Sequence, residues 1–169
     1  ITPDDAWGVT RYEREACRKI IAGSRYGGMF TPMSTKGTVM YPQVGGGSNW
    51  GGGAFDPERN ILVVPVSQVP FYVRLIPADQ VDKTKARDPR AGNPMGPPGL
   101  IKGTDYGLEQ KAVLSPLFSP CTAPPWSLMV AVDMINGDIL WKTPFGKIDQ
   151  LSPLPIGFEW GTPFAGGAI

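Results

Sequence analysis

Asn49-Trp50-Gly51-Gly52-Gly53-Ala54-Phe55-Asp56-Pro57 is followed by the apolar run Ile61–Val66 and then by Phe71–Leu75. β-branched and aromatic residues dominate both runs, which is typical of strands, and the pair Asp-Pro at 56–57 is typical of a tight turn. The stretch therefore predicts a strand, a turn and further strands. The small residues before the turn would let a flat group lie close to the backbone.

Short runs of strand-forming residues recur along the rest of the chain. They predict strands at 38–41, 53–55, 61–66, 71–75, 129–133 and 139–143. Their apolar character suggests sheets that are covered on both faces, as in the stacked blades of a β-propeller. The predicted fold is therefore mainly β, with helix in the minority.

The first 23 residues are predicted to be helical. Thr2-Pro3-Asp4-Asp5 combines a capping hydroxyl, a proline at the first helical position and two acids, and Thr10-Arg11-Tyr12-Glu13 repeats the capping pattern. Gly23 would end the helix. We expect the apolar face to contain Tyr12, Ala16, Cys17, Ile20 and Ile21.

Between residues 77 and 126 prolines and glycines occur throughout, and we expect one long loop. The 169 residues include 22 glycines and 19 prolines, together with five Trp, five Tyr and seven Phe that can anchor a core. The composition therefore indicates a loop-rich β protein and not a disordered one. Because structureless loops longer than about 15 residues are uncommon in a compact domain, we expect this segment to pack against other parts of a longer protein.

The charge balance gives no sign of a nucleic-acid partner. The formal net charge is +1, and the basic residues are scattered along the chain, whereas nucleic-acid binding needs a basic patch. No apolar run approaches the roughly 20 residues that cross a bilayer, and the first residues do not resemble a signal peptide. Since the sequence starts without Met and stops in what looks like the approach to a strand, we expect a piece of a longer protein.

Cys17 and Cys121 are the two cysteines of the chain. Their separation excludes a CxxC redox or zinc motif and leaves two buried thiols or a disulfide as alternatives. Cys17 lies on the apolar side of the predicted helix, and Cys121 lies in a proline-rich loop that needs an anchor. We favour the disulfide, which would imply an oxidising compartment.

The sharpest spaced pattern is Ala131-x-Asp133-x-x-x-Gly137-x-x-x-Trp141. Asp133 can accept backbone hydrogen bonds in a turn between two strands, Gly137 can take a positive φ, and Trp141 can dock flat between sheets. The pattern resembles the tryptophan-docking motif that quinoprotein dehydrogenases repeat around an eight-bladed β-propeller. The resemblance implies a structural role for these four residues.

Further motifs, in the same order along the chain, resemble the membrane-bound PQQ-dependent dehydrogenases that oxidise glucose, quinate or shikimate. They are Trp7-Gly8, Phe30-Thr31-Pro32, Asn49-Trp50-Gly51-Gly52, Val69-Pro70-Phe71, Ser119-Pro120-Cys121, Pro125-Trp126 and Gly161-x-Pro163. The resemblance implies a partial eight-bladed propeller of about two to three blades, with an N-terminal helix and a long Pro/Gly-rich loop. It divides the chain into a helical segment (1–23), blade strands (24–76), the long loop (77–126), and the docking-motif blade with the start of the next (127–169).

In this family PQQ lies on the propeller axis, stacked on a Trp, bound to Ca²⁺ and contacted by polar side chains. The resemblance points to Asn49, Trp50 and Gln68 as cofactor-binding residues. Each has a plainer alternative: Asn49 could shape the turn, Trp50 could pack in the core, and Gln68 could be an ordinary loop residue. No catalytic residue is expected here, because the catalytic Asp of the family lies upstream. The Ca²⁺ ligands are also expected outside this chain, which alone should be inactive.

The resemblance implies that the complete protein oxidises a sugar or cyclic polyol and passes electrons through PQQ to ubiquinone. This would occur at the periplasmic face of the bacterial inner membrane, with the membrane helices and the remaining blades outside this chain. Two other classes stay open, namely a non-catalytic propeller module for binding or assembly and an independently folding regulatory domain. Because the chain contains no His, Ser-His-Asp hydrolysis and His-based metal sites are excluded.

Overall fold

A computed structural model of the chain describes residues 1–45, 47–49, 51–82, 98–147 and 159–162. The chain forms two compact units, and each unit is built from two separate stretches of sequence. Unit 1 contains Ile1–Tyr41 and Pro70–Thr122, and unit 2 contains Pro42–Val69 and Ala123–Ile169.

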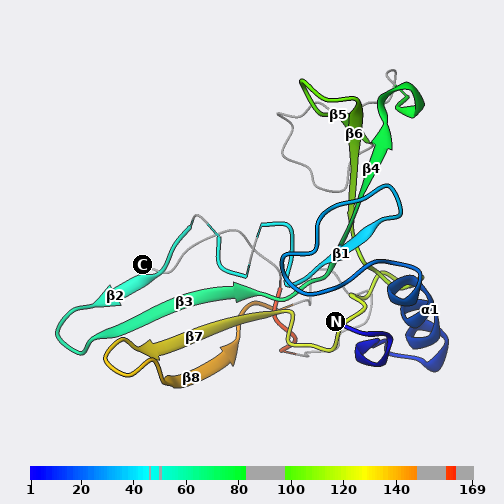
Figure 1. Cartoon of the computed structure of the whole chain (residues 1–169). Coiled ribbons are helices and arrows are strands. Elements are labelled where there is room, and N and C mark those ends of the chain that lie inside the picture. The colour runs from blue at the N-terminus through cyan, green and yellow to red at the C-terminus, as the bar shows by residue number, and fades with distance from the viewer. Residues whose placement is uncertain (46, 50, 83–97, 148–158, 163–169) are drawn as a thin grey trace. The chain divides into compact units, whose positions relative to one another are not determined.

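Unit 1 contains a four-stranded sheet with the strand order β1-β4-β6-β5. Its strands are β1 (Thr38–Met40), β4 (Phe71–Pro77), β5 (Gly99–Leu100) and β6 (Tyr106–Ala112), and the short 3-10 helix η2 (Ala78–Gln80) follows β4. Figure 1 shows β4 and β6 as a long pair of strands. They are antiparallel, with Phe71 opposite Ala112 at one end and Pro77 opposite Tyr106 at the other.

Helix α1 (Arg11–Ala22) begins with the capping box that the sequence predicts. The Thr10 hydroxyl accepts a hydrogen bond from the Glu13 N–H at 3.2 Å, and the Glu13 carboxylate accepts one from the Thr10 N–H at 3.1 Å. Gly23 caps the other end. The predicted helical region thus consists of a short 3-10 helix, η1 (Pro3–Asp5), followed by one α-helix.

The buried face of α1 differs from the predicted apolar face. Glu13, Cys17 and Ile21 are buried, whereas Tyr12 is 69% exposed and Ile20 is 38% exposed. Glu13 can take this place because hydrogen bonds satisfy its carboxylate, which would otherwise make its burial costly. One cluster of buried residues in unit 1 consists of Ala6, Cys17, Ile21, Val39, Val113 and Cys121.

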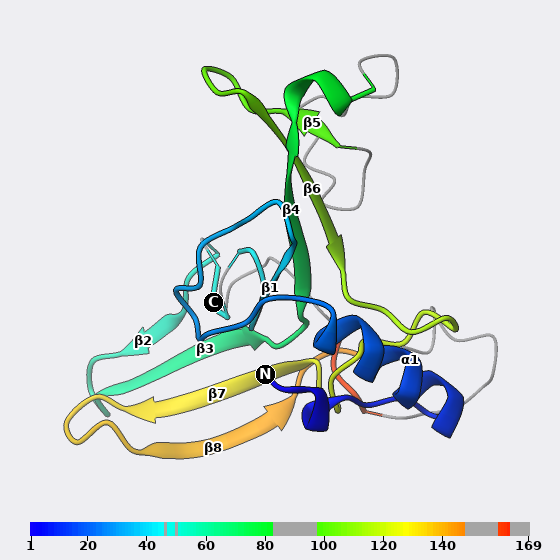
Figure 2. The same cartoon turned by 45° about the vertical axis from the view of Figure 1, so that its right-hand side comes forward.

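Unit 2 contains a second four-stranded sheet, with the strand order β2-β3-β7-β8. Its strands are β2 (Ala54–Asp56), β3 (Ile61–Ser67), β7 (Ser127–Asp133) and β8 (Ile139–Pro144). Figure 2 shows the four strands side by side, and β3 pairs with β7 along its full length. The turn between β2 and β3 forms where predicted, with the Asp56 carboxylate accepting hydrogen bonds from the backbone N–H groups of Glu58 and Arg59.

The long loop predicted at 77–126 needs correction, because β5 and β6 lie inside it. The β6 sequence Tyr-Gly-Leu-Glu-Gln-Lys-Ala contains few strand-forming residues. It forms a strand because it pairs with β4, where Leu108 lies opposite Leu75 and the Glu109 carboxylate lies 2.8 Å from the Arg74 guanidinium. Local sequence alone does not reveal a strand that depends on its partner. The segment 83–97 lies outside the described residues.

The predicted mainly β character is confirmed. Among the described residues, eight strands accompany one α-helix and two 3-10 helices. In the same part of the chain, no helix is long and apolar enough to cross a bilayer.

Candidate cofactor site

A backbone hydrogen bond closes the turn at Asn49, and the absence of a side chain at Gly45 leaves space beside the Asn49 amide. The Asn49 carbonyl accepts a hydrogen bond from the Gly52 N–H at 2.9 Å, and Gly52 takes a φ of +67° that favours glycine. A methyl group at Gly45 would come within 2.9 Å of the Asn49 side-chain nitrogen. Gly45 therefore leaves room for the half-buried Asn49 amide.

A backbone hydrogen bond brings this turn to the end of β3. The Ser67 N–H donates to the Gly47 carbonyl at 2.6 Å. Gly47 lies two residues before Asn49, and Ser67 lies one residue before Gln68. The hydrogen bond between Ser67 and Gly47 thus connects the segments that carry Asn49 and Gln68, two of the three predicted cofactor residues. The third, Trp50, lies outside the described residues.

Gln68 is fixed by two hydrogen bonds to the segment that precedes β7. Its backbone N–H donates to the Trp126 carbonyl at 2.8 Å, and its side-chain Nε2 donates to the Pro125 carbonyl at 3.2 Å. The second bond sets the orientation of the amide, because only the nitrogen end can donate to a carbonyl. Gln68 is half-buried, and its side chain is anchored to a residue 57 positions further along the chain.

Two tryptophans lie beside the anchor of Gln68. Trp126 is 4% exposed and packs edge-to-face against Trp160, with ring centroids 5.3 Å apart. The Trp126 N–H also donates to the Trp160 carbonyl at 2.6 Å. Neither tryptophan was among the predicted site residues. The sequence features that could have pointed to them are the proline pair before Trp126 and the Trp-Gly pair at 160–161.

The arrangement suits binding more than proton transfer. Asp56 follows the Asn49 turn in the sequence, and its carboxylate lies 2.7 Å from the Arg59 guanidinium. Hydrogen bonds from the Arg59 side chain and from the turn backbone hold the pKa of Asp56 below its usual range. A carboxylate that is already paired and has a low pKa is a poor general base. Within the described ranges, no group of three or more Cys, Asp or Glu side chains could hold a metal ion.

The docking-motif residues form a turn and two strands in unit 2. The Asp133 carboxylate accepts a hydrogen bond from the Ile135 N–H at 2.8 Å, the Gly137 N–H donates to the Asp133 carbonyl at 2.8 Å, and Gly137 has a φ of +83°. Ala131 lies opposite Trp141 in the β7–β8 pair. Ala131 is fully buried, whereas Trp141 is 47% exposed.

Cys17 and Cys121 are joined by a disulfide in unit 1. Both residues are fully buried. The bridge connects α1 to the segment after β6 across 104 residues of sequence. Backbone hydrogen bonds hold the same segment, from the Trp7 N–H to the Cys121 carbonyl and from the Cys121 N–H to the Val113 carbonyl, both at 3.0 Å.

Comparison with known families identifies the class of protein. The family model for PQQ, described as the glucose/ethanol/alcohol dehydrogenase β-propeller domain, matches residues 1–169. The chain therefore belongs to the β-propeller family of PQQ-dependent dehydrogenases. This confirms the predicted family and the partial propeller fold. The two four-stranded antiparallel sheets agree with it, because the blades of a propeller are four-stranded sheets.

Curated bacterial relatives match nearly the whole chain. The quinoprotein glucose dehydrogenase of Escherichia coli (strain K12) is 34% identical over 98% of it, and quinoprotein glucose dehydrogenase A of Acinetobacter calcoaceticus is 35% identical over 100%. A probable quinate dehydrogenase (quinone) of Xanthomonas campestris pv. juglandis is 31% identical over 100%. The chain spans 21–22% of the length of these relatives and so corresponds to a fragment of a larger protein. No solved structure matches.

Proposed function

We propose that the complete protein containing this chain oxidises a sugar or cyclic polyol of the glucose, quinate or shikimate class. The observation that carries the proposal is the match of the family model over all 169 residues. Relatives named for glucose and quinate oxidation cover the chain almost completely, and one of the others is named as a glycerol dehydrogenase large subunit. Electrons would pass from PQQ to ubiquinone at the periplasmic face of the inner membrane, with membrane helices supplied by other parts of the protein.

Asn49, Trp50 and Gln68 are the residues of this chain that we propose to contact PQQ. When bound, PQQ supplies the two-electron acceptor for the alcohol. An amide can both donate and accept hydrogen bonds, so Asn49 and Gln68 suit a ligand with carbonyl and carboxylate groups. The bond to the Pro125 carbonyl supports this role because it restrains the Gln68 amide before a ligand binds, and the room at Gly45 accommodates the Asn49 amide. Ca²⁺ and the general base would be held by residues outside this chain.

Reconstitution of the full-length protein tests the proposed reaction. Apo-protein supplied with PQQ and Ca²⁺ should reduce a dye when glucose, quinate, shikimate or glycerol is present. A lack of turnover with every sugar and polyol in a broad panel would contradict the enzyme and favour a non-catalytic propeller module. A sharp cooperative melt of this chain expressed alone would favour an independently folding domain instead.

The role of Gln68 is tested separately by titrating PQQ into full-length variants. Gln68→Leu should weaken PQQ binding about tenfold, because a hydrogen bond to a charged ligand is lost. Gln80→Leu is the matched control: Gln80 is exposed in η2 of unit 1, so PQQ affinity should not change. Equal PQQ affinities in wild type and Gln68→Leu, at equal Tm, would remove Gln68 from the cofactor site.

A further inference from the structure

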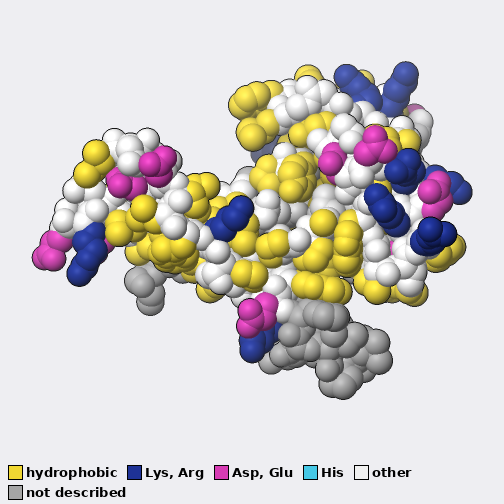
Figure 3. All heavy atoms as spheres, turned by 90° about the horizontal axis from the view of Figure 1, so that it is seen from below, with side chains coloured by type: hydrophobic (Ala, Val, Ile, Leu, Met, Phe, Trp, Pro, Cys, Tyr) yellow, Lys and Arg dark blue, Asp and Glu magenta, His cyan; other side chains and the backbone are white. Residues whose placement is uncertain are grey.

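A pocket on unit 1 is lined by four charged side chains of helix α1. It is lined by Arg11, Arg14, Glu15 and Arg18, and its volume is about 430 Å³. The three arginines recur at intervals of three and four residues, which places them along one face of the helix. From Arg11 to Arg18 this face extends about 10 Å along the helix axis. Toward the right of Figure 3, where α1 lies, several Lys and Arg side chains reach the surface.

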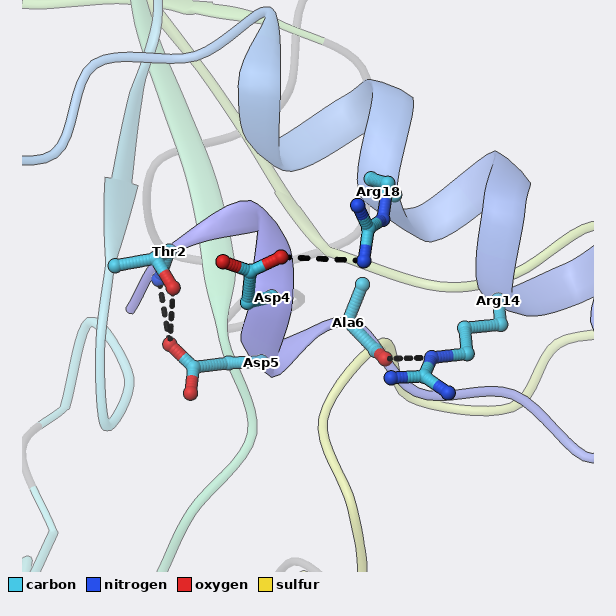
Figure 4. A network of polar contacts seen from close by, with 6 residues as sticks. All are labelled: Thr2, Asp4, Asp5, Ala6, Arg14 and Arg18. Carbon is cyan, nitrogen blue, oxygen red and sulfur yellow. Dashed lines mark hydrogen bonds and ion pairs between the residues drawn. The ribbon is translucent and has the colours of Figure 1, made fainter.

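Two of the arginines are held in position by the segment before α1, as Figure 4 shows. The Arg14 Nε donates to the Ala6 carbonyl at 3.0 Å, and the Arg18 guanidinium lies 3.2 Å from the Asp4 carboxylate. The Ala6 contact uses one N–H of Arg14 and leaves its two terminal NH₂ groups to serve another acceptor. The Ala6 contact restrains the Arg14 side chain before any ligand arrives, which lowers the entropic cost of binding, whereas the exposed Asp4 pair adds little restraint to Arg18.

The charge of the pocket favours an anion. Three guanidinium groups face one carboxylate, Glu15, in the lining. Arg11–Arg14 and Arg14–Arg18 are like-charge pairs at helical spacing, which destabilise a helix. Within the part of the chain that the structure describes, Arg11 makes no ion pair. The nearby carboxylates only partly offset the repulsion among the three arginines. An anion bound in the pocket would therefore reduce this repulsion.

We infer that this pocket binds a phosphate group. Planar guanidinium forks match the oxygen geometry of phosphate better than a lysine ammonium does, and several of them together can contact one ligand. The pocket draws on no residue of the Asn49 and Gln68 site, and it does not depend on the proposed dehydrogenase activity. The phosphate could be a free ion or ester or the head group of an anionic lipid, and the two sources share the same contact chemistry.

Calorimetric titration of the full-length protein tests the inference with two probes, inorganic phosphate and a water-soluble short-chain phosphatidylglycerol. At a constant ionic strength of about 0.15 M, to separate binding from screening, at least one probe should bind saturably with a Kd below about 10 mM. Saturation by phosphate identifies a free anion as the ligand, and saturation by the lipid alone identifies a head group. Saturation by neither overturns the inference.

Arg11→Gln is the decisive variant, because Arg11 has no protein partner among the described residues and its loss should leave the fold intact. We expect the Kd of the bound probe to rise about twofold to fivefold. Arg11→Lys should restore part of the affinity, since it keeps the charge but not the planar fork. Arg25→Gln removes an exposed guanidinium elsewhere in unit 1 and should leave the Kd unchanged. Equal affinities in wild type and Arg11→Gln would overturn the site.

Discussion

The carboxylate of Glu13 accepts a hydrogen bond from the hydroxyl of Ser115, which lies 102 residues further along the chain. Ser119 donates to the same oxygen at 3.0 Å, and the Thr10 N–H donates to the other oxygen at 3.1 Å. Glu13 is 1% exposed. One helix-capping residue thus also fixes the turn at residues 115–119, next to the cysteine at 121.

Replacing Glu13 by Ala should destabilise unit 1 by about 2–4 kcal/mol, because the buried hydroxyl of Ser115 and the half-buried hydroxyl of Ser119 would lose this acceptor. The matched control is Glu15→Ala, which removes an exposed carboxylate from the same helix and should change stability by no more than about 0.5 kcal/mol. Thermal unfolding of the full-length protein, followed by circular dichroism, compares the two. Similar Tm values for both variants would show that the buried network contributes nothing.

The same carboxylate should make stability depend on pH in the acid range. Burial raises the pKa of Glu13, but the hydrogen bonds from Ser115, Ser119 and Thr10 outweigh burial and bring it below its usual range. Because the pKa is lower in the folded protein than in the unfolded chain, the stabilisation is complete above about pH 4.3, the pKa of free Glu. It is lost as the pH falls through the lower, folded value. The Tm advantage of wild type over Glu13→Gln should therefore be constant between about pH 5 and 6 and shrink below about pH 4. An advantage that stays constant down to pH 3 would contradict this linkage.

Alanine substitutions at Gly37 and Gly103 distinguish the effect of a steric clash from the effect of the backbone conformation. Their φ values are +85° and +81°, so an Ala at either position meets the same left-handed strain of about 1 kcal/mol. Gly103 has open space around it, whereas a methyl group at Gly37 would clash with the Tyr72 ring. Gly37→Ala should therefore cost about 2 kcal/mol more than Gly103→Ala. Thermal unfolding measures the difference, and adding Tyr72→Ala to Gly37→Ala should reduce it; equal Tm values for the two single variants would contradict the clash.

The bridge between Cys17 and Cys121 can be checked by intact mass spectrometry. Protein made under oxidising conditions should gain the mass of two hydrogens on reduction, and alkylation without reductant should add nothing at these positions. Reduction should also destabilise unit 1 by about 2–5 kcal/mol, as expected for a bridge that closes a long loop. An unchanged mass would mean that the two cysteines are free thiols.

The docking role proposed for Trp141 predicts different behaviour for two exposed aromatic residues. Trp141 is 47% exposed and Phe30 is 91% exposed in this chain. If Trp141 docks between sheets of the complete propeller, Trp141→Ala should destabilise the full-length protein by about 2–4 kcal/mol. Phe30→Ala should change its Tm little. Equal and small Tm changes would show that Trp141 has no docking partner.

Features set by neighbouring residues were predictable from the sequence. The capping box of Thr10 and Glu13, the helix end at Gly23 and the turn at Asp56 each depend on residues within a few positions of one another. The burial of Glu13 was not predictable, because its partners Ser115 and Ser119 come from a distant segment. The β6 strand was missed for the same reason, since its pairing with β4 and not its composition makes it a strand.

The candidate cofactor site likewise has a part that was predicted from the sequence and a part that was not. Asn49 and Gln68 were found through the resemblance to a family, and both stand beside the contact between Gly47 and Ser67. The anchor of Gln68 at Pro125 was not foreseen, because it joins positions 57 residues apart. The resemblance therefore identified candidate residues, but only the fold shows what holds the Gln68 amide in place.

The interleaving of the two units has a consequence for biosynthesis. Ser67 at the end of β3 pairs with Ser127 at the start of β7, so the ribosome must add the whole intervening part of unit 1 before this ladder can begin to close. At bacterial and eukaryotic elongation rates that delay amounts to roughly 3–12 s. During this delay β3 can pair with β2 only over Ile61–Val63, so its edge toward β7 stays unpaired and open to other strands unless a chaperone shields it.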